Sequence, residues 1–294
     1  EHWCRIPVEV ELSHEFRYRD PIIDPHTLVV SISQSGETMD TLMAVRYAKE
    51  QGARTVSICN TNGSTIPRES DAVLYTHAGP EIAVASTKAF LAQITAAYLL
   101  GLYMAQLRGN MFADEIQDVL EELQAMPEKV QAVIDEEDQL RQLGKDFAET
   151  PSVLFLGRHV GFPVAMEGAL KLKEIAYIHA EGFAAGELKH GPLALVDADM
   201  PVVTVAPNNE LLEKLKSNLQ EVRARGGELI VFADREAGFE NGEGIFLVNM
   251  PHIHDALAPI LYTLPLQLLS YYVAVLRGTD VDQPRNLAKS VTVE

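Results

Sequence analysis

A stretch of ten residues, SISQSGETMD (residues 31–40), carries four hydroxyls and an amide between an apolar run and a segment with helical periodicity. The start of a helix offers unpaired backbone N–H groups and the positive end of the helix dipole. The side-chain donors at this junction, which suit the oxygens of a phosphate monoester, are Ser33, Gln34, Ser35 and Thr38. A helix cap without a ligand is the simpler alternative, but a single serine satisfies it.

The same loop lacks the marks of a nucleotide site. It contains no lysine and does not have the GxxxxGK[ST] spacing of a nucleotide-hydrolysing loop. The GxGxxG pattern of dinucleotide sites is also absent from the chain. The residues therefore favour a phosphate monoester over a nucleotide.

A second group of residues is suited to proton transfer. Glu174 lies three positions after Lys171 in KLKEIAY, a spacing that places both on one face of a helix. A positioned carboxylate can act as a general base, and a nearby cation keeps it ionised. An ordinary surface Lys–Glu pair is the alternative, and spacing alone favours it.

Three further segments carry candidate groups. His190 in ELKHGP lies in a predicted turn before the strand-like run LALVD, and histidine suits proton transfer near neutral pH. Lys289 lies in a polar tail that by itself resembles a disordered terminus. In HIHD, two histidines two residues apart lack other recognisable ligands, so we expect no metal site.

Composition restricts the possible partners. The 294 residues are 47% apolar and 22% charged, with a net charge of −18. This charge argues against a nucleic-acid partner and against an anionic membrane. The two cysteines, Cys4 and Cys59, form no CxxC pair, which favours a reducing, cytoplasmic location.

The elements that must position these residues occur as a repeat. The order strand, helix, strand, strand, long apolar helix appears twice, and continuous apolar strands alternating with helices predict parallel sheets covered on both faces. The fold class is therefore α/β, with two doubly wound parallel-sheet sandwiches in tandem. The predicted strands cover residues 26–33, 52–60 and 71–77 in the first half and 200–207, 227–234 and 244–250 in the second.

Each half ends in a long apolar segment, residues 89–107 and 257–276. Both are close to membrane-spanning length, but polar residues and prolines interrupt them. We expect helices buried on nearly all sides, with a subunit interface as the favoured cover, and no membrane partner. The acidic segment 113–150 is predicted to form helices that join the halves.

The second half also has elements that the first lacks. A strand with a glycine turn (151–159) and a helix (162–176) precede its repeat, and their counterparts would precede residue 1. We therefore expect the first domain to lack its opening strand, turn and most of a helix. An exposed sheet edge of this kind favours weak sugar-phosphate binding and early proteolysis within residues 1 to about 110.

Four motifs then point to a family. SISQSGETMDT, VASTKAF, EGALKLKEIAYIHAEGFAAGELKHGPLAL and DQPRNLAKSVTVE resemble the isomerase half of the glutamine–fructose-6-phosphate aminotransferase family, whose domains have the sugar isomerase (SIS) fold. The likeness runs from about Arg5 to Glu294. It implies flavodoxin-like SIS domains at 1–145 (including linker helices) and 146–277, followed by an active-site tail at 278–294.

The resemblance also implies roles for single residues. Glu174 would be the proton-transfer base, with Lys171 as its relay or partner. His190 would open the sugar ring from the neighbouring subunit, which implies a homodimer, and Lys289 would contact the open-chain carbonyl. The segment that lines the sugar would include Val84, Ala85 and Ser86.

The implied reaction converts fructose 6-phosphate and glutamine-derived ammonia into glucosamine 6-phosphate, without a metal or organic cofactor. The glutamine-hydrolysing half would be a partner domain that this chain does not include. Two alternatives remain: a different SIS-fold sugar-phosphate isomerase or deglycase, which should not need the RNLAKSVTVE tail, and a non-catalytic sugar-phosphate sensor, which should lack the Lys171–Glu174 pair.

Overall fold

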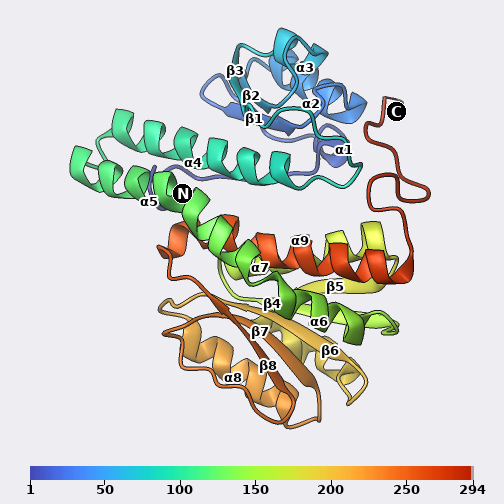
Figure 1. Ribbon diagram of the computed structural model, residues 1–294. Coiled ribbons are helices and arrows are strands. Elements are labelled where there is room, and N and C mark those ends of the chain that lie inside the picture. Colours follow the sequence, from blue (N-terminus) through green and yellow to red (C-terminus); the bar gives the residue numbers. More distant parts are fainter. Residues whose placement is uncertain (293–294) are drawn as a thin grey trace. The chain divides into compact units, whose positions relative to one another are not determined.

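The computed structural model describes residues 1–292 (Figure 1). The chain forms two compact units, each described here by itself. The first comprises Glu1–Asp118 and the tail from Asn286, and the second comprises Val119–Arg285.

The first unit contains a three-stranded parallel sheet in the order β1-β2-β3. Continuous apolar strands alternate with helices here, as in other parallel sheets. Its elements are α1 (Ser13–Phe16), β1 (Leu28–Ser33), α2 (Met39–Glu50), β2 (Arg54–Cys59), α3 (Thr65–Glu69), β3 (Ala72–Tyr75) and α4 (Lys88–Arg108).

The core of this unit is small. Leu42 and Val45 of α2 pack against Ile66 of α3. The hydroxyls of Ser31 and Ser57 bond across β1 and β2 at 2.8 Å, so these buried polar groups are satisfied. Alternate residues of β1 remain partly exposed, which leaves one face of the sheet incompletely covered by the described residues.

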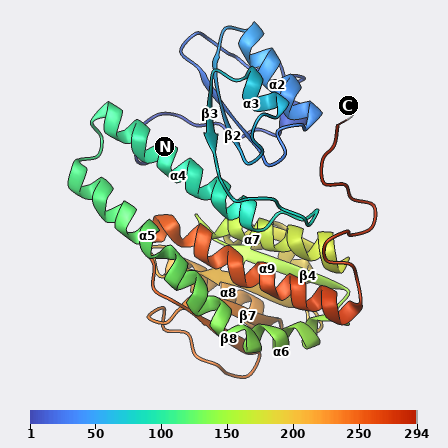
Figure 2. The ribbon, with the colours of Figure 1, turned by 45° about the horizontal axis from the view of Figure 1, so that its top comes forward.

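The second unit contains a five-stranded parallel sheet in the order β5-β4-β6-β7-β8. Every residue of its central strand β6 is buried. The helices α7 and α9 cover one face and α8 covers the other (Figure 2). Its elements are α5 (Ala113–Asp135, which begins in the first unit), α6 (Glu137–Phe147), β4 (Ser152–Gly157), α7 (Gly161–Lys171), the π-helix η1 (Leu172–Ala176), β5 (His179–Ala184), the 3-10 helices η2 (Ala185–His190) and η3 (Pro192–Leu195), β6 (Pro201–Ala206), α8 (Leu212–Arg223), β7 (Glu228–Asp234), β8 (Ile245–Met250), the 3-10 helix η4 (Asp255–Leu257) and α9 (Ala258–Arg277).

The predicted fold class is confirmed. All strands are parallel, and the strand order of the second sheet is that of flavodoxin-like sandwiches. The sequence analysis missed β5, because its residues HAEGFA include a glycine and two alanines and are poor strand formers. The strand-like run LALVD was interpreted wrongly, since Pro192–Leu195 form a 3-10 turn and are followed by a short loop.

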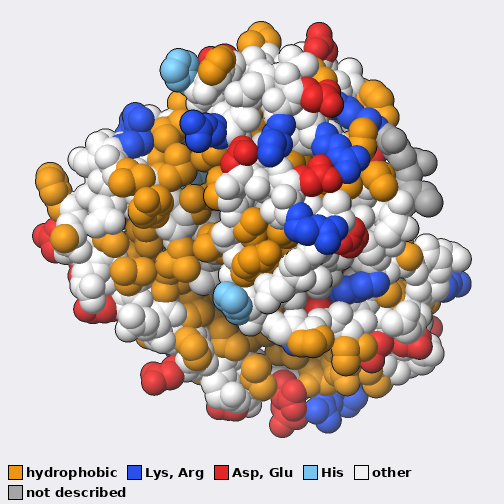
Figure 3. All heavy atoms as spheres, turned by 90° about the horizontal axis from the view of Figure 1, so that it is seen from above, with side chains coloured by type: hydrophobic (Ala, Val, Ile, Leu, Met, Phe, Trp, Pro, Cys, Tyr) orange, Lys and Arg blue, Asp and Glu red, His pale blue; other side chains and the backbone are white. Residues whose placement is uncertain are grey.

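The two long apolar helices differ in burial. Both are long and apolar enough to cross a membrane by length and composition, but 67% of the most apolar window in Asp255–Arg277 is buried, as expected for a core helix. Only 17% of the corresponding window in α4 is buried by the described residues, so the expected burial of α4 in a subunit interface stays a prediction. Its residues Leu99, Tyr103 and Leu107 are exposed. Figure 3 shows hydrophobic side chains gathered on the side where α4 lies.

The division between the compact units falls between residues 118 and 119, whereas the predicted domains divide at residue 145, and that domain boundary stays a prediction. The reason is packing: α6, predicted as part of a linker, packs on α9 and thereby joins the second unit. The tail from Asn286 packs with the first unit, although the residues directly before it belong to the second unit.

Candidate functional site

The hydroxyl-rich loop lies where the sequence places it, at the carboxyl end of β1 before α2. Ser33 is buried, and its Oγ accepts a hydrogen bond from the Gly36 N–H at 3.0 Å. Gly36 has a φ of +68°, and a Cβ there would come within 2.0 Å of the Ser64 hydroxyl. Glycine is therefore required at this position of the turn that connects β1 to α2.

The other three predicted donors lie in the same turn. Ser35 Oγ accepts from the Glu37 N–H at 3.2 Å, and the Gln34 carbonyl accepts from Thr61 Oγ1 at 3.2 Å. Thr38 precedes the first residue of α2, but its side chain makes no capping hydrogen bond. The simple helix-cap interpretation needs that bond at Thr38, and the ligand-binding role of this hydroxyl stays a prediction.

One acidic residue, Glu37, also lies in the loop. Its Oε1 accepts from the Thr65 N–H at 2.8 Å, at the first residue of α3. Hydrogen bonds from the Thr65 side chain and backbone lower the pKa of the Glu37 carboxyl. The carboxylate is thus engaged with the helix N-terminus of α3, where a negative charge is favourable.

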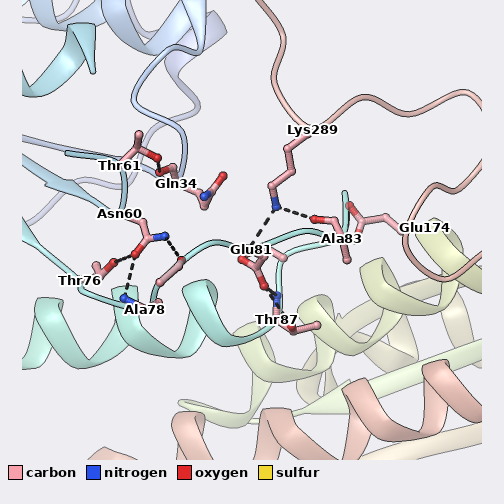
Figure 4. Close-up of polar contacts among 12 residues, drawn as sticks. Gln34, Asn60, Thr61, Thr76, Ala78, Glu81, Ala83, Thr87, Glu174 and Lys289 are labelled. Carbon is pink, nitrogen blue, oxygen red and sulfur yellow. Dashed lines mark hydrogen bonds and ion pairs between the residues drawn. The ribbon is translucent and has the colours of Figure 1, made fainter. Parts of the chain in front are cut away.

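The loop after β3 is bonded to the end of β2 by Asn60, which the sequence analysis missed. Its Oδ1 accepts from Thr76 Oγ1 and from the Ala78 N–H, both at 2.9 Å, and its Nδ2 donates to the Gly79 carbonyl at 2.8 Å (Figure 4). Asn60 follows β2, so it links the ends of β2 and β3. An asparagine directly after a buried strand is the sequence signal that would have identified it.

The predicted sugar-lining segment is held by Glu81, another residue that the sequence analysis missed. The carboxylate accepts hydrogen bonds from Ser86 Oγ at 2.9 Å, from the Thr87 N–H at 2.7 Å and from Thr87 Oγ1 at 3.0 Å. Its side chain is 3% exposed. These bonds curl residues 81–87 into a compact loop, in which Ala85 is buried and Val84 and Ser86 are half-buried.

The tail reaches this loop. Lys289 Nζ donates to the Ala83 carbonyl at 2.6 Å and lies 4.0 Å from Glu81 Oε2 (Figure 4). Ser290 Oγ lies 3.2 Å from Ser35 Oγ, and the Val291 carbonyl accepts from the N–H of Met39 at 3.1 Å. Within the first unit, the structure therefore brings the hydroxyl loop, the 81–87 loop and Lys289 together.

The second unit holds the proton-transfer candidates. Lys171, the last residue of α7, donates a hydrogen bond to Glu174 Oε2, as the i,i+3 spacing predicts. Glu174 lies on η1, a π-helical turn, and such turns are frequent at functional sites. Lys171 is buried and Glu174 is half-buried, so the pair is not the ordinary surface pair that spacing alone suggested.

A third titratable residue, Glu167, completes this group. Its Oε1 lies 3.4 Å from Lys171 Nζ, one helical turn before it. Burial raises the pKa of the Glu167 carboxyl to about 7, the Lys171 charge opposes that rise and the Glu174 charge adds to it. The sequence analysis missed Glu167, although its i,i+4 spacing from Lys171 is visible in EGALK.

His190 stands apart from these residues in the described structure. It is the last residue of η2, it is exposed, and Gly191 follows it with a φ of +146°. The turn predicted for it is thus a 3-10 helix. No hydrogen bond or ion pair joins His190 to Lys171 or Glu174 among the described residues, and its assignment to the site stays a prediction.

In the structure, the HIHD segment lies beside acidic residues from another part of the chain. His252 Nδ1 lies 2.8 Å from Asp234 Oδ2 at the end of β7, and Glu236 lies nearby. His254 accepts from the Ala256 N–H and caps η4. The ligand atoms of Asp234, Glu236 and His252 lie within 4.8 Å of one another, and the expectation of no metal stays a prediction.

Known proteins resemble this chain throughout. The SIS domain family matches residues 1–103 and 146–277. The glutamine–fructose-6-phosphate aminotransferases of Corynebacterium glutamicum and Pseudomonas syringae pv. tomato are each 65% identical to it, over 100% and 98% of this chain and 48% of their own lengths. The chain thus spans about half the length of the curated relatives it matches.

Solved structures agree. The C-terminal domain of glucosamine-fructose-6-phosphate aminotransferase from Francisella tularensis is 47% identical, with a TM-score of 0.93 over 96% of this chain and 82% of that one. A glucosamine-6-phosphate deaminase from Thermotoga maritima is 26% identical, with a TM-score of 0.74 over 95% and 80%. The chain therefore belongs to the SIS domain family and, within it, to the isomerase part of the glutamine–fructose-6-phosphate aminotransferases.

Proposed function

We propose that this chain is the isomerase module that forms glucosamine 6-phosphate from fructose 6-phosphate and ammonia. The observation that carries the proposal is the buried Lys171–Glu174 pair at a π-helical turn, in a chain that also presents a hydroxyl-rich anion loop. A sensor needs the loop but has no use for a buried base with its own cation. The close relatives named above support the same reaction.

The proposed chemistry begins with recognition of the phosphate. Ser33, Gln34, Ser35 and Thr38, with the N–H groups at the start of α2, would bind the three phosphate oxygens. The loop that contains Val84, Ala85 and Ser86 would line the sugar. The amine of Lys289 would contact the carbonyl of the open-chain substrate after His190 of a second subunit has opened the ring.

Ammonia then adds to C2 and water leaves, which gives the C2 imine. Glu174 removes a proton from C1, and the same proton is returned to C2 as the C1 hydroxyl becomes the aldehyde. Lys171 donates a hydrogen bond to Glu174 and would hold this carboxylate in place during the transfer. No metal or organic cofactor is required, because the imine carbon already acidifies the C1 hydrogen.

The proposal also covers the domains of the chain, its oligomeric state and its location. We assign the first SIS domain to residues 1–145, the second to 146–277 and the active-site tail to 278–294. We further propose a homodimer in the cytoplasm and, in the full-length protein, a glutaminase domain that supplies ammonia, since the relatives are about twice as long as this chain.

The test is incubation of the protein with fructose 6-phosphate and free ammonium, followed by NMR. We expect glucosamine 6-phosphate to accumulate without glutamine. The likeness to a glucosamine-6-phosphate deaminase favours a second candidate, a deglycase that runs towards ammonia release. Net consumption of added glucosamine 6-phosphate, with no forward product at high ammonium, would support that candidate instead.

A further inference from the structure

Three titratable side chains, Glu167, Lys171 and Glu174, lie one helical turn apart at the end of α7 and in η1. Their side chains are 9%, 4% and 22% exposed. Two carboxyl groups thus face one ammonium in a poorly solvated place. Burying two negative charges against one positive charge is unfavourable, so the energy of the group depends on whether the second carboxyl is protonated.

The two carboxyl groups do not share the ammonium equally. Lys171 Nζ donates a hydrogen bond to Glu174 Oε2. Glu167 Oε1 lies 3.4 Å from the same nitrogen but makes no hydrogen bond, although it is fully shielded from solvent. This arrangement is the one expected when Glu167 holds a proton and only Glu174 is charged.

The charged groups around Glu167 can be followed through the elements that surround α7. The elements that pack against α7 are β4, β5, β6, α9 and η1. The strands β4 and β6 carry no titratable side chain, β5 carries a histidine and a glutamate, α9 carries three tyrosines and an arginine, and η1 carries the exposed Lys173 beside Glu174. Among the described residues, the charges that act on Glu167 are those of Lys171 and Glu174, and burial outweighs them to bring its pKa to about 7.

We propose that Glu167 is a positioning residue that competes with Glu174 for Lys171. When Glu167 is protonated, the Lys171 ammonium donates its hydrogen bond to Glu174 and holds that carboxylate in one orientation. When Glu167 releases its proton to water, its new charge draws the ammonium away and Glu174 loses its partner. The inference rests on the proposed function, because it gives Glu167 a role in the proton transfer between C1 and C2.

The competition can be measured in this chain without any substrate. In protein with ¹³C-labelled glutamate carboxyl carbons, the signal lost in Glu174→Gln reports on Glu174. We expect this signal to show an inflection near pH 7, where Glu167 titrates, and Glu167→Gln should remove the inflection. The control is Glu213→Gln, which neutralises an exposed Glu–Lys pair at i,i+3 and should leave the Glu174 signal unchanged.

Kinetics then separate positioning from a merely structural role. In the full-length protein, we expect C1 proton exchange of fructose 6-phosphate to slow above pH 7, while Glu167→Gln keeps its rate. The variant should match the parent at pH 6 within about twofold and exceed it by roughly three- to tenfold at pH 8, with KM unchanged within about twofold.

The outcomes distinguish the two proposals. An unaltered pH course of the Glu174 signal in Glu167→Gln overturns the positioning role. A variant whose rate falls equally at every pH overturns it as well, since that is the behaviour of a structural residue. If the parent exchanges no C1 proton at any pH, the proposed function fails, and the carboxyl titration still decides whether Glu167 and Glu174 compete for Lys171.

Discussion

The two sheets repeat one strand order with very different degrees of burial. Strand β6 opens the repeat in the second unit and lies between β4 and β7, with all of its residues buried. Strand β1 opens the repeat in the first unit and pairs only with β2 among the described strands, and Val30 and Ile32 are 38% and 52% exposed. The same local pattern therefore yields a core strand or an edge strand, depending on its neighbours.

The polar side chains of the two units also differ in kind. The first unit presents neutral hydroxyl and amide donors, which would bind an anion without changing its protonation. The second unit buries a lysine with two glutamates, which can move a proton. Under the proposed function, ligand binding falls mainly to the unit with the less covered sheet and proton transfer to the unit with the buried sheet.

The largest expected effect concerns proton transfer. Glu174→Gln in the full-length protein should lower C1 hydrogen exchange of fructose 6-phosphate by about 10²- to 10⁴-fold, because the general base is lost. Binding of the sugar phosphate should stay within about threefold, since the proposed phosphate donors lie in the first unit. Exchange and binding are read by NMR and calorimetry. Exchange at the parent rate would remove Glu174 from the reaction.

The next effect concerns the binding unit. Replacing Ser33, Ser35 and Thr38 by alanine should cost roughly 1–3 kcal/mol for each hydrogen bond to phosphate that is lost. We expect affinity for fructose 6-phosphate to fall at least about 100-fold by calorimetry, with an unchanged circular dichroism spectrum. Ser57, a buried hydroxyl of β2 below the loop, offers the control Ser57→Ala. Unchanged affinity in the triple variant would contradict the assignment of this loop.

A third effect is a pH dependence of stability in the second unit. The pKa of Glu167 is raised from 4.5 to about 7 in the folded protein, so folding binds a proton between these values. The stability that this proton contributes is complete below pH 4.5 and is lost as pH rises through 7. Glu167→Gln should therefore be about 3 kcal/mol more stable than the parent at pH 8 and equal to it at pH 4.

Hydrogen exchange of the α7 and β5 amides measures this difference locally. The control, Glu213→Gln, should follow the parent at both pH values. A parent and a Glu167→Gln variant that lose stability together between pH 5 and 8 would show that Glu167 is ionised throughout.

The smallest effect compares matched strand positions directly. Val203 and Val30 are the third residues of β6 and β1, and they are 0% and 38% exposed. Val203→Ala should destabilise the second unit by about 2 kcal/mol, whereas Val30→Ala should cost the first unit less than about 0.5 kcal/mol.

The two units can be observed separately in this experiment. Fluorescence of Trp3, which lies 5.7 Å from the Tyr98 ring of α4, reports on the first unit. Hydrogen exchange of β6 and β7 reports on the second. Equal losses in the two variants would mean that β1 is covered in solution as β6 is in this structure.

Much of the fold follows from local pattern. Apolar strands such as TLVVSIS and PVVTVA and the helical periodicity between them sufficed to predict α/β sandwiches, because a parallel strand must be apolar on both faces. The missed strand β5 shows the limit of this reasoning. Its residues have little strand propensity, and hydrogen bonds from β4 hold them in the sheet.

Some residues of the candidate site could likewise be identified from the local sequence, and others could not. Ser33, Gln34, Ser35 and Thr38 were identifiable because a cluster of donors at a strand-to-helix junction has one local cause. Glu81 was not, because its importance lies in the groups of Thr87 that it bonds once the loop has folded. Asn60 was missed, although an asparagine directly after a buried strand is a local signal.

The sequence by itself determined the repeat, the parallel sheets, the anion loop and the facing of Lys171 and Glu174, since each depends on residues within one turn or one strand. Only the tertiary structure decided which strand is buried, which loops meet Lys289, and that Glu167 loses its contact with water. Those properties depend on which distant segments exclude solvent. Burial changes the energy of a charge far more than any local spacing does, so Glu167 becomes a neutral-pH acid in the fold.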